Sequence, residues 1–259
     1  MYRVKSNALW HSLPGVVAAY QPIAAPDSLA AQQNVAHGGA RFGVYTATPG
    51  TAPTWSAATG WTFNGTTQHL IVTATATIGW SILVRFSNAA STAGYPTLAG
   101  AYIYASDRYI CYLRAYQDAT HRLYANGSYI LPSGALVNGV MGISRLSCFL
   151  NGMADGTITS VSSATAVNVG IGVGMHDGVP SAVTWYKGSI QSFLLASRPF
   201  SPAEMWLASR QMAYCDVNPD WNAWARRRRY YYAPSAAAAA AFNPAWARNT
   251  NILLGGGFD

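Results

Sequence analysis

Residues 183–204, VTWYKGSIQSFLLASRPFSPAE, contain the two signals that decide the fold. The first part is rich in β-branched and aromatic residues on either side of a glycine, which predicts a strand, a glycine bend and a buried core strand. Ser201 and Glu204 then have the spacing of a capping box, with Pro202 at the first helical position. The pattern predicts a short helix over residues 201–212.

The chain before this stretch also predicts strands. Residues 79–86 (GWSILVRF) alternate and then become fully apolar, as in a buried strand of a sandwich. Residues 109–116 (YICYLRAY) form a second such run. Asn126-Gly127 and Asn151-Gly152 separate strand-like runs, and Asn-Gly supplies the two positive φ angles that a tight hairpin turn requires. The body of the chain is therefore predicted to be all-β.

Composition divides the chain into three regions. Residues 1–60 hold a candidate edge strand near residues 13–20 and a long ordered loop with a short helix near residues 28–34. Residues 61–215 are expected to form the sandwich core with its helix. Residues 216–259 form an extended arm rich in Arg, Tyr, Trp and Ala, which lacks the pattern of a domain with its own core.

Charge is scarce in this chain. Charged residues make up 10% of the 259 residues, against about 25% in an average soluble protein. A surface of Ser, Thr, Ala, Gly, Asn and aromatics suits a protein whose outside is largely covered by partners.

No apolar run reaches the ~18 residues of a membrane helix, and residues 1–10 lack the apolar block of a secretion signal. We therefore expect neither membrane insertion nor secretion.

The basic residues concentrate near the C-terminus. Residues 221–259 hold five arginines and one aspartate, and so carry +4 of the net charge of +7. Arg, Tyr and Trp are enriched at protein interfaces, but arginines beside stacking aromatics also suit nucleic acid, and a solvated tail is a third interpretation. We favour a partner-binding arm. Its candidate residues are Trp221, Trp224, Arg226, Arg227, Arg228, Arg229, Tyr230, Tyr231, Tyr232 and Trp246.

Several enzyme chemistries lack their residues. Glu204 is the only glutamate, and capping the helix accounts for it. A retaining glycosidase needs two carboxyl groups about 5–5.5 Å apart, and no strand carries the required pattern. There is no Gly-x-Ser-x-Gly motif, and the five histidines follow no metal-binding spacing. Cys111, Cys148 and Cys215 form no Cys-x-x-Cys pair and are expected to be buried free thiols. The sequence therefore predicts a protein that is not an enzyme and needs no cofactor.

Six segments, taken in chain order, point to a fold family. They are PGVVAAY (14–20), WTFNGTTQHL (61–70), WSILVRF (80–86), CFLNG (148–152), GSIQSFLL (188–195) and FSPAE (200–204). Together they resemble the laminin-G-like, concanavalin A-like jelly-roll domain, over about residues 12–215. The most specific part is the last strand, whose Gly-x-Ile pattern leads into a Phe-Ser-x-x-Glu helix.

This resemblance implies an all-β, antiparallel two-sheet jelly-roll sandwich with one short C-terminal helix and an extended C-terminal tail. Domains of the family often bind carbohydrate or protein. Relatives with this kind of apolar body and an Arg/Tyr/Trp-rich tail look like bacteriophage virion and prophage proteins. Some members hold calcium at the sandwich rim, for which the candidate ligands here are Asp107, Asp155 and Asp177.

The expected function is that of a non-enzymatic bacteriophage virion structural protein, in a capsid decoration, tail or fibre, made in the host cytoplasm. It would form a homo-oligomer and bind other virion proteins through its arm. One alternative is a nucleic-acid-associated capsid component, which needs Arg226–Arg229. Another is a lectin-like module for host-surface glycans, which needs exposed aromatics. The candidate carbohydrate-binding residues are Tyr95, Tyr102, Tyr104, Trp185 and Tyr186.

Overall fold

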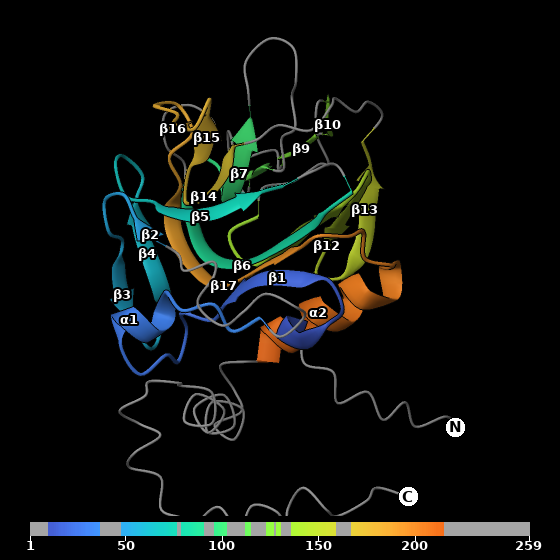
Figure 1. Ribbon diagram of the computed structural model, residues 1–259, viewed down its shortest axis with the longest axis horizontal. Coiled ribbons are helices and arrows are strands. Elements are labelled where there is room, and N and C mark those ends of the chain that lie inside the picture. Colours follow the sequence, from blue (N-terminus) through green and yellow to red (C-terminus); the bar gives the residue numbers. More distant parts are fainter. Residues whose placement is uncertain are drawn as a thin grey trace, which may run out of the picture. The chain divides into compact units, whose positions relative to one another are not determined.

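Two β-sheets pack face to face in the computed structural model, and a helix covers the outer side of the first sheet (Figure 1). The structure describes residues 10–36, 48–76, 79–90, 96–102, 112–114, 123–126, 128–130, 136–158 and 167–214. By its internal contacts the chain divides into two units, residues 1–218 and 219–259, and all described residues lie in the first. No described helix has the length and apolarity needed to span a membrane.

The first sheet has eight strands and is centred on the antiparallel pair β6 and β17. Ser81 lies opposite Ala196 and Ala90 opposite Lys187. On its other side β17 pairs first with β4 and then with β1, so this one strand holds three neighbours together. The members are β13 (Met153–Thr157), β12 (Ser147–Leu150), β11 (Gly139–Ser144), β6 (Ser81–Ala90), β17 (Lys187–Ala196), β4 (Gly60–Asn64), β3 (Thr54–Ser56) and β1 (Val16–Tyr20).

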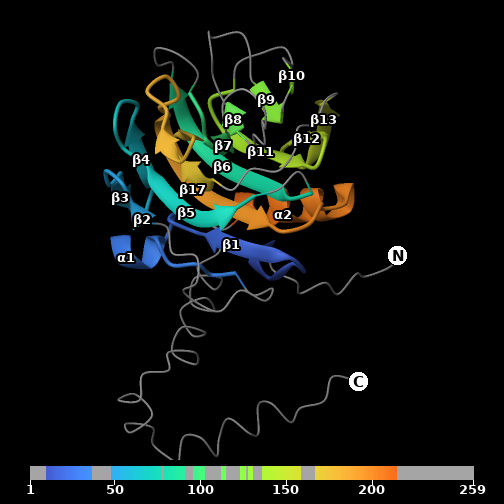
Figure 2. The same cartoon turned by 45° about the horizontal axis from the view of Figure 1, so that its top comes forward.

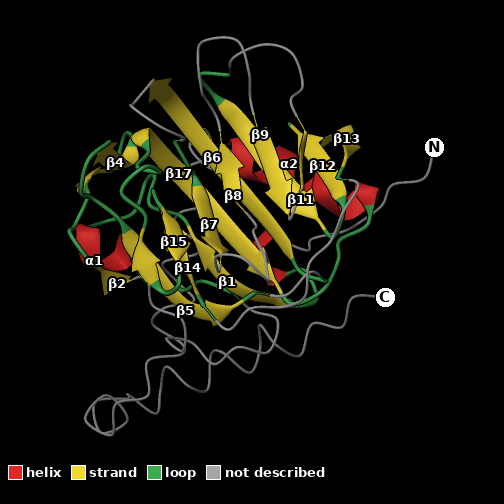
Figure 3. Cartoon of the chain, turned by 90° about the horizontal axis from the view of Figure 1, so that it is seen from above, coloured by secondary structure: helices red, strands yellow, loops and turns green. Residues whose placement is uncertain are grey.

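The second sheet has nine shorter strands, seen from above in Figure 3. Along β5, Leu70, Val72 and Ala74 are buried against the first sheet, whereas Thr73 and Thr75 are exposed. This period of two is what a strand with one covered face requires. The members are β10 (Ser128–Ile130), β9 (Leu123–Asn126), β8 (Tyr112–Arg114), β7 (Ala99–Tyr102), β14 (Asn168–Ile171), β5 (Leu70–Thr75), β2 (Thr48–Pro49), β15 (Gly174–His176) and β16 (Val179–Pro180).

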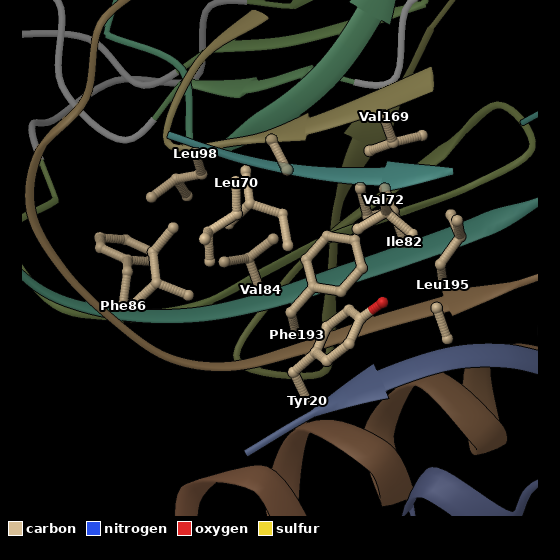
Figure 4. Packing of buried hydrophobic residues seen from close by; sticks show 14 of the residues in the cluster. Tyr20, Leu70, Val72, Ile82, Val84, Phe86, Leu98, Val169, Phe193 and Leu195 are labelled. Carbon is tan, nitrogen blue, oxygen red and sulfur yellow. The ribbon is translucent and has the colours of Figure 1, made fainter. Parts of the chain in front are cut away.

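Aromatic and aliphatic side chains from both sheets fill the space between them. The ring of Tyr20 lies 5.8 Å from that of Phe193 and 5.9 Å from that of Trp61, and burial raises the pKa of the Tyr20 hydroxyl well above its ordinary value. Each fully buried large apolar side chain contributes about 1.5–3 kcal/mol. The side chains labelled in Figure 4 are Tyr20, Leu70, Val72, Ile82, Val84, Phe86, Leu98, Val169, Phe193 and Leu195.

Helix α2 (Pro202–Tyr214) begins at the capping box that the sequence predicts. The Glu204 carboxylate accepts hydrogen bonds from the backbone N–H of Ser201 at 2.8 Å and from its hydroxyl at 3.0 Å. At the other end, the Arg85 guanidinium donates to the carbonyl of Met212 at 2.9 Å. A cation at a helix C-terminus is favourable because it meets the negative end of the helix dipole.

The outer face of the first sheet carries a layer of helical structure. α2 contacts the 3₁₀ helix η1 (Trp10–Ser12) and strands β6, β11 and β13, on the side away from β5 (Figure 1 and Figure 2). Met205, Ala208 and Met212 are fully buried in this layer. Successive residues Ser192–Ala196 of β17 are all buried, so both faces of this strand are covered, which explains its continuous apolar run.

Most local predictions agree with these elements, and three differ. Residues 183–186, expected to form a strand before a glycine bend, form none; β17 begins at Lys187 and runs through Gly188 with a shift of register there. The hairpin at Asn151-Gly152 joins β12 to β13 with φ of 50° and 82°. Residues 21–60, expected as a loop, also contain β2 and β3. The short helix is confined to α1 (Ser28–Ala31), where Asp27 accepts a hydrogen bond from the N–H of Ala30 at 2.6 Å.

Candidate functional site

The aromatic residues proposed for sugar binding do not form one platform. Tyr95 and Tyr104 lie outside the described residues, and Tyr102 ends β7. Trp185 and Tyr186 precede β17 and have opposite environments. Since successive side chains of an extended segment point to opposite sides, these two neighbours cannot share one surface.

Tyr186 belongs to the core, which corrects its assignment to a sugar platform. The side chain is 1% exposed, and its ring lies 6.1 Å from that of Phe63, edge to face. Its hydroxyl donates to the carbonyl of Ser87 at 3.3 Å, and complete burial raises its pKa well above the ordinary value. A ligand could reach this ring only by opening the sandwich.

Trp185 lies on the outer side of the second sheet. It is half-buried and packs with Ile71 and Val167 against a small apolar cluster of Ala101, Val173 and Met175. The β5 residue Ile71 sits between Leu70 and Val72, which face the core, so the cluster covers the opposite face of that sheet. Part of the indole stays accessible above this base.

His69 supports the indole from the neighbouring segment. Its ring lies 5.5 Å from that of Trp185, tilted by 56°, and the histidine is only 7% exposed. Its Nδ1 is 3.1 Å from the carbonyl of Thr67. Because a carbonyl only accepts hydrogen bonds, Nδ1 carries a proton. The His69 ring is therefore held in one position beside the indole of Trp185.

The segment after β2 holds His69 in place. The N–H of His69 donates to the carbonyl of Thr51 at 2.9 Å, and the N–H of Gly50 donates to the carbonyl of His69 at 3.3 Å. A Cβ at Gly50 would overlap the imidazole, so only glycine permits this approach. The segment after β2 is thus packed directly against His69.

Thr184 fixes the backbone just before Trp185. Its hydroxyl accepts from the N–H of Gly174 at 3.0 Å and donates to the carbonyl of Ser181, also at 3.0 Å. The N–H of Thr97 donates to the carbonyl of Thr184 at 3.1 Å. With its backbone anchored to the second sheet on one side and to β17 on the other, Trp185 has a defined position.

Polar residues flank the two rings along the chain, with Thr67 two residues before His69 and Lys187 two residues after Trp185. The loop after β4 is organised by Asn64, whose Oδ1 accepts from the N–H groups of Thr66 and Thr67 at 2.9 and 3.1 Å. Thr51, Thr66, Thr67 and Lys187 are exposed. Lys187 is the register partner of Asn64. The segments that carry the two rings thus also carry exposed hydroxyls, an amide and one ammonium group, and the indole itself is partly exposed.

The candidate calcium ligands are not brought together where the structure describes them. Asp107 lies outside the described residues. Asp155 is on β13 in the first sheet. Asp177 is in the turn between β15 and β16, where its Oδ2 lies 3.3 Å from Nε2 of His176. Among the described residues no three His, Cys, Asp or Glu side chains cluster in a way that could hold a metal ion.

The proposed partner-binding arm, from Trp221 to Trp246, lies entirely outside the described residues.

His69 is the site residue that sequence reasoning missed. It lies directly before β5. No local pattern indicates its partner, because Trp185 is far away along the chain.

No family model and no curated protein matches this sequence. Among solved structures, the fold is similar to that of a Trypanosoma rangeli sialidase in complex with 2,3-difluoro-KDN, with a TM-score of 0.52 and 12% identity over 79% of this chain and 34% of that chain. The same sialidase as a covalent 2,3-difluorosialic acid intermediate gives a TM-score of 0.51 and 13% identity, over 75% and 33%.

Domain 4 of a GH43 extracellular arabinanase from Geobacillus stearothermophilus, in complex with arabinotriose, has a TM-score of 0.43 and 12% identity, over 75% of this chain and 98% of that chain. The chain spans about a third of the sialidase. At such identities the similarity to the sialidase shows the fold alone, which is a β-sandwich.

Proposed function

We propose that the protein is a carbohydrate-binding β-sandwich module that acts by binding and not by catalysis. The observation that carries this proposal is the ring pair of Trp185 and His69 on the outer side of the second sheet. Sugar sites combine an apolar ring face with a few placed polar groups. Here the indole offers the ring face, and the exposed residues Asn64, Thr67 and Lys187 lie on the segments next to His69 and Trp185.

Of the five aromatic residues expected to bind sugar, this site uses Trp185 alone. Trp185 binds the apolar face of a sugar ring, and the loop after β4 supplies hydrogen bonds to its hydroxyls. His69 is a positioning residue, because it touches the indole while remaining almost fully buried. A sialidase in complex with a sialic acid derivative shares the fold, which supports a sugar as the class of ligand.

The adjacent residues 185 and 186 provide a matched pair of variants. The full chain is titrated calorimetrically with a panel of soluble glycans that includes sialyllactose and arabinotriose. We expect W185A to weaken binding by about tenfold or more, since base- or sugar-stacking aromatics contribute on the order of 1–3 kcal/mol. Y186F keeps its buried ring and should bind like the unsubstituted chain. Binding by none of the glycans, or equal binding by W185A, would contradict the proposal.

A second proposal concerns assembly. Low charge and the resemblance to a concanavalin A-like jelly roll of virion proteins support a homo-oligomeric structural component of a bacteriophage particle, with residues 216–259 contacting other virion proteins. Light scattering of the full chain tests this. Joint substitution of Trp221, Trp224 and Trp246 by Ala should reduce the oligomer to smaller species, and an unchanged mass would count against the arm.

The nucleic-acid alternative makes a separate prediction for the same arm. Four adjacent arginines that contact phosphates should give DNA affinity that falls steeply with salt. Substituting Arg226–Arg229 by Gln should then abolish that affinity. An assembly role predicts little DNA binding in either form.

A further inference from the structure

The outward face of α2 carries an ordered row of large side chains. Trp206, Arg210 and Tyr214 follow one another at intervals of four residues, so they share one side of the helix. The Arg210 guanidinium carbon lies 5.8 Å from the centroid of the Trp206 ring and 5.5 Å from that of Tyr214. One of its nitrogens donates to the Tyr214 hydroxyl at 3.4 Å. The guanidinium is thus held between two rings.

This row is exposed and extends onto the adjoining hairpin. Trp206 is 48% exposed, Tyr214 56% and Met153 64%. Gly152, directly before Met153, approaches α2 so closely that a Cβ there would lie 2.8 Å from the Cα of Trp206. Met153 therefore lies on the hairpin that packs against α2 beside Trp206. Tryptophan, tyrosine and arginine are the residue types that dominate binding energy at interfaces.

The Arg210 guanidinium can still pair with an anion. No carboxylate among the described residues pairs with Arg210, and Glu204, its nearest acid along α2, is taken by Arg198. An arginine held between ring faces keeps its planar fork ready for two-point pairing with a carboxylate. The described part of the chain therefore supplies no carboxylate to this guanidinium.

We propose that this face, made of Trp206, Arg210, Tyr214 and Met153, docks an acidic segment of a different protein. An aspartate or glutamate of that segment pairs with Arg210, and its apolar neighbours cover the two rings and Met153. The same face of a second copy fits less well, because the one acid of its α2, Glu204, is already paired with Arg198.

The docking face is independent of the sugar site. α2 packs on the outer side of the first sheet, whereas Trp185 lies on the outer side of the second sheet. A protein partner and a glycan could be held at the same time, on opposite faces of one sandwich. Substitutions in one site should leave the other unaffected.

The test uses the full chain and two labelled peptides that differ only in charge. One peptide has Asp-Glu between Phe and Leu, and the other has Asn-Gln in the same places. Fluorescence anisotropy should show about tenfold tighter binding of the acidic peptide, the usual gain from a two-point charged contact. R210Q should remove this preference. K187Q, which removes the same charge outside α2, should keep it.

Three outcomes would overturn the proposal. Equal affinity for the two peptides would show that no carboxylate site exists on this face. A preference that survives in R210Q would place the anion site elsewhere. If R210Q instead dissociates an oligomer of the chain in sedimentation experiments, the face is occupied by a second copy. Arg210 is exposed, so R210Q should fold normally, and thermal unfolding confirms this for each variant.

Discussion

Arg198 forms a two-point ion pair with Glu204, the residue that caps helix α2. The same guanidinium donates through Nε to the carbonyl of Pro14 at 2.8 Å, and its stem packs against Gly15. One side chain therefore joins the segment before β1 to the start of the C-terminal helix. The capping role predicted for Glu204 is confirmed. Through Arg198, the same carboxylate also connects the start of α2 to the segment before β1.

This pair predicts an acid-sensitive contribution to stability. Hydrogen bonds from Arg198 are the main reason that the pKa of Glu204 is lowered from 4.5 to about 2. Because the folded-state pKa is depressed, the unfolded chain binds more protons between these values, and the stabilisation present above pH 4.5 is lost as the pH falls to about 2. Solvent screens the partly exposed pair, so E204Q should cost about 1–2 kcal/mol at pH 7.

Urea unfolding of E204Q and the unsubstituted chain between pH 2 and pH 7 measures this contribution. The difference in unfolding free energy should shrink towards zero as the pH approaches 2. D177N removes a carboxylate of the same charge from the β15–β16 turn and serves as the control. A difference for E204Q that stays constant with pH would mean that the ion pair contributes nothing beyond the neutral cap.

Two glycines with similar φ separate steric overlap from backbone strain. Gly172 has φ of 78° and a Cβ there would overlap the Phe63 ring, whereas Gly178 has φ of 82° with no atom within 4 Å. G178A should cost about 1–2 kcal/mol from the left-handed conformation alone. G172A should cost about 1–3 kcal/mol more, because the buried ring must move. If G172A and G178A lose equal amounts of unfolding free energy in urea, the Phe63 ring can move aside without cost.

The thiol of Cys148 is predicted to be unreactive in the folded protein. Burial raises its pKa to about 12 from an ordinary 9, and the Asp155 carboxylate adds to the shift. Since the thiolate is the reactive species, alkylation at pH 8 should be about a thousandfold slower than in the unfolded chain. The rate is measured with iodoacetamide in a C111S/C215S background, with and without urea. Rapid labelling without urea would show that β12 opens readily.

Local signals in the sequence predicted the elements well, because each depends on a few adjacent residues. The capping box at Ser201 and the turn at Asn151-Gly152 carry their geometry in their own side chains and φ angles. The site was less predictable. Trp185 and Tyr186 look alike in sequence, and only the tertiary fold, which places Tyr186 against Phe63 and Ser87, decides which of the two enters the core. His69 meets Trp185 because the second sheet brings distant segments together, which no spacing along the chain encodes.

Asn34 is a buried residue that no sequence pattern singled out, and it completes the edge at β1. Its Oδ1 accepts from the N–H groups of Ala19 and Ala36, each at 2.9 Å, and its Nδ2 donates to the carbonyl of Val17 at 2.8 Å. N34A leaves these backbone groups without partners and should cost about 2–3 kcal/mol. N34D retains an acceptor but places a carboxylate against the Val17 carbonyl, so it should destabilise at least as much at pH 7. Q33A, at an exposed neighbour, is the control. If thermal unfolding shows N34A to be as stable as Q33A, water replaces the amide and β1 does not depend on it.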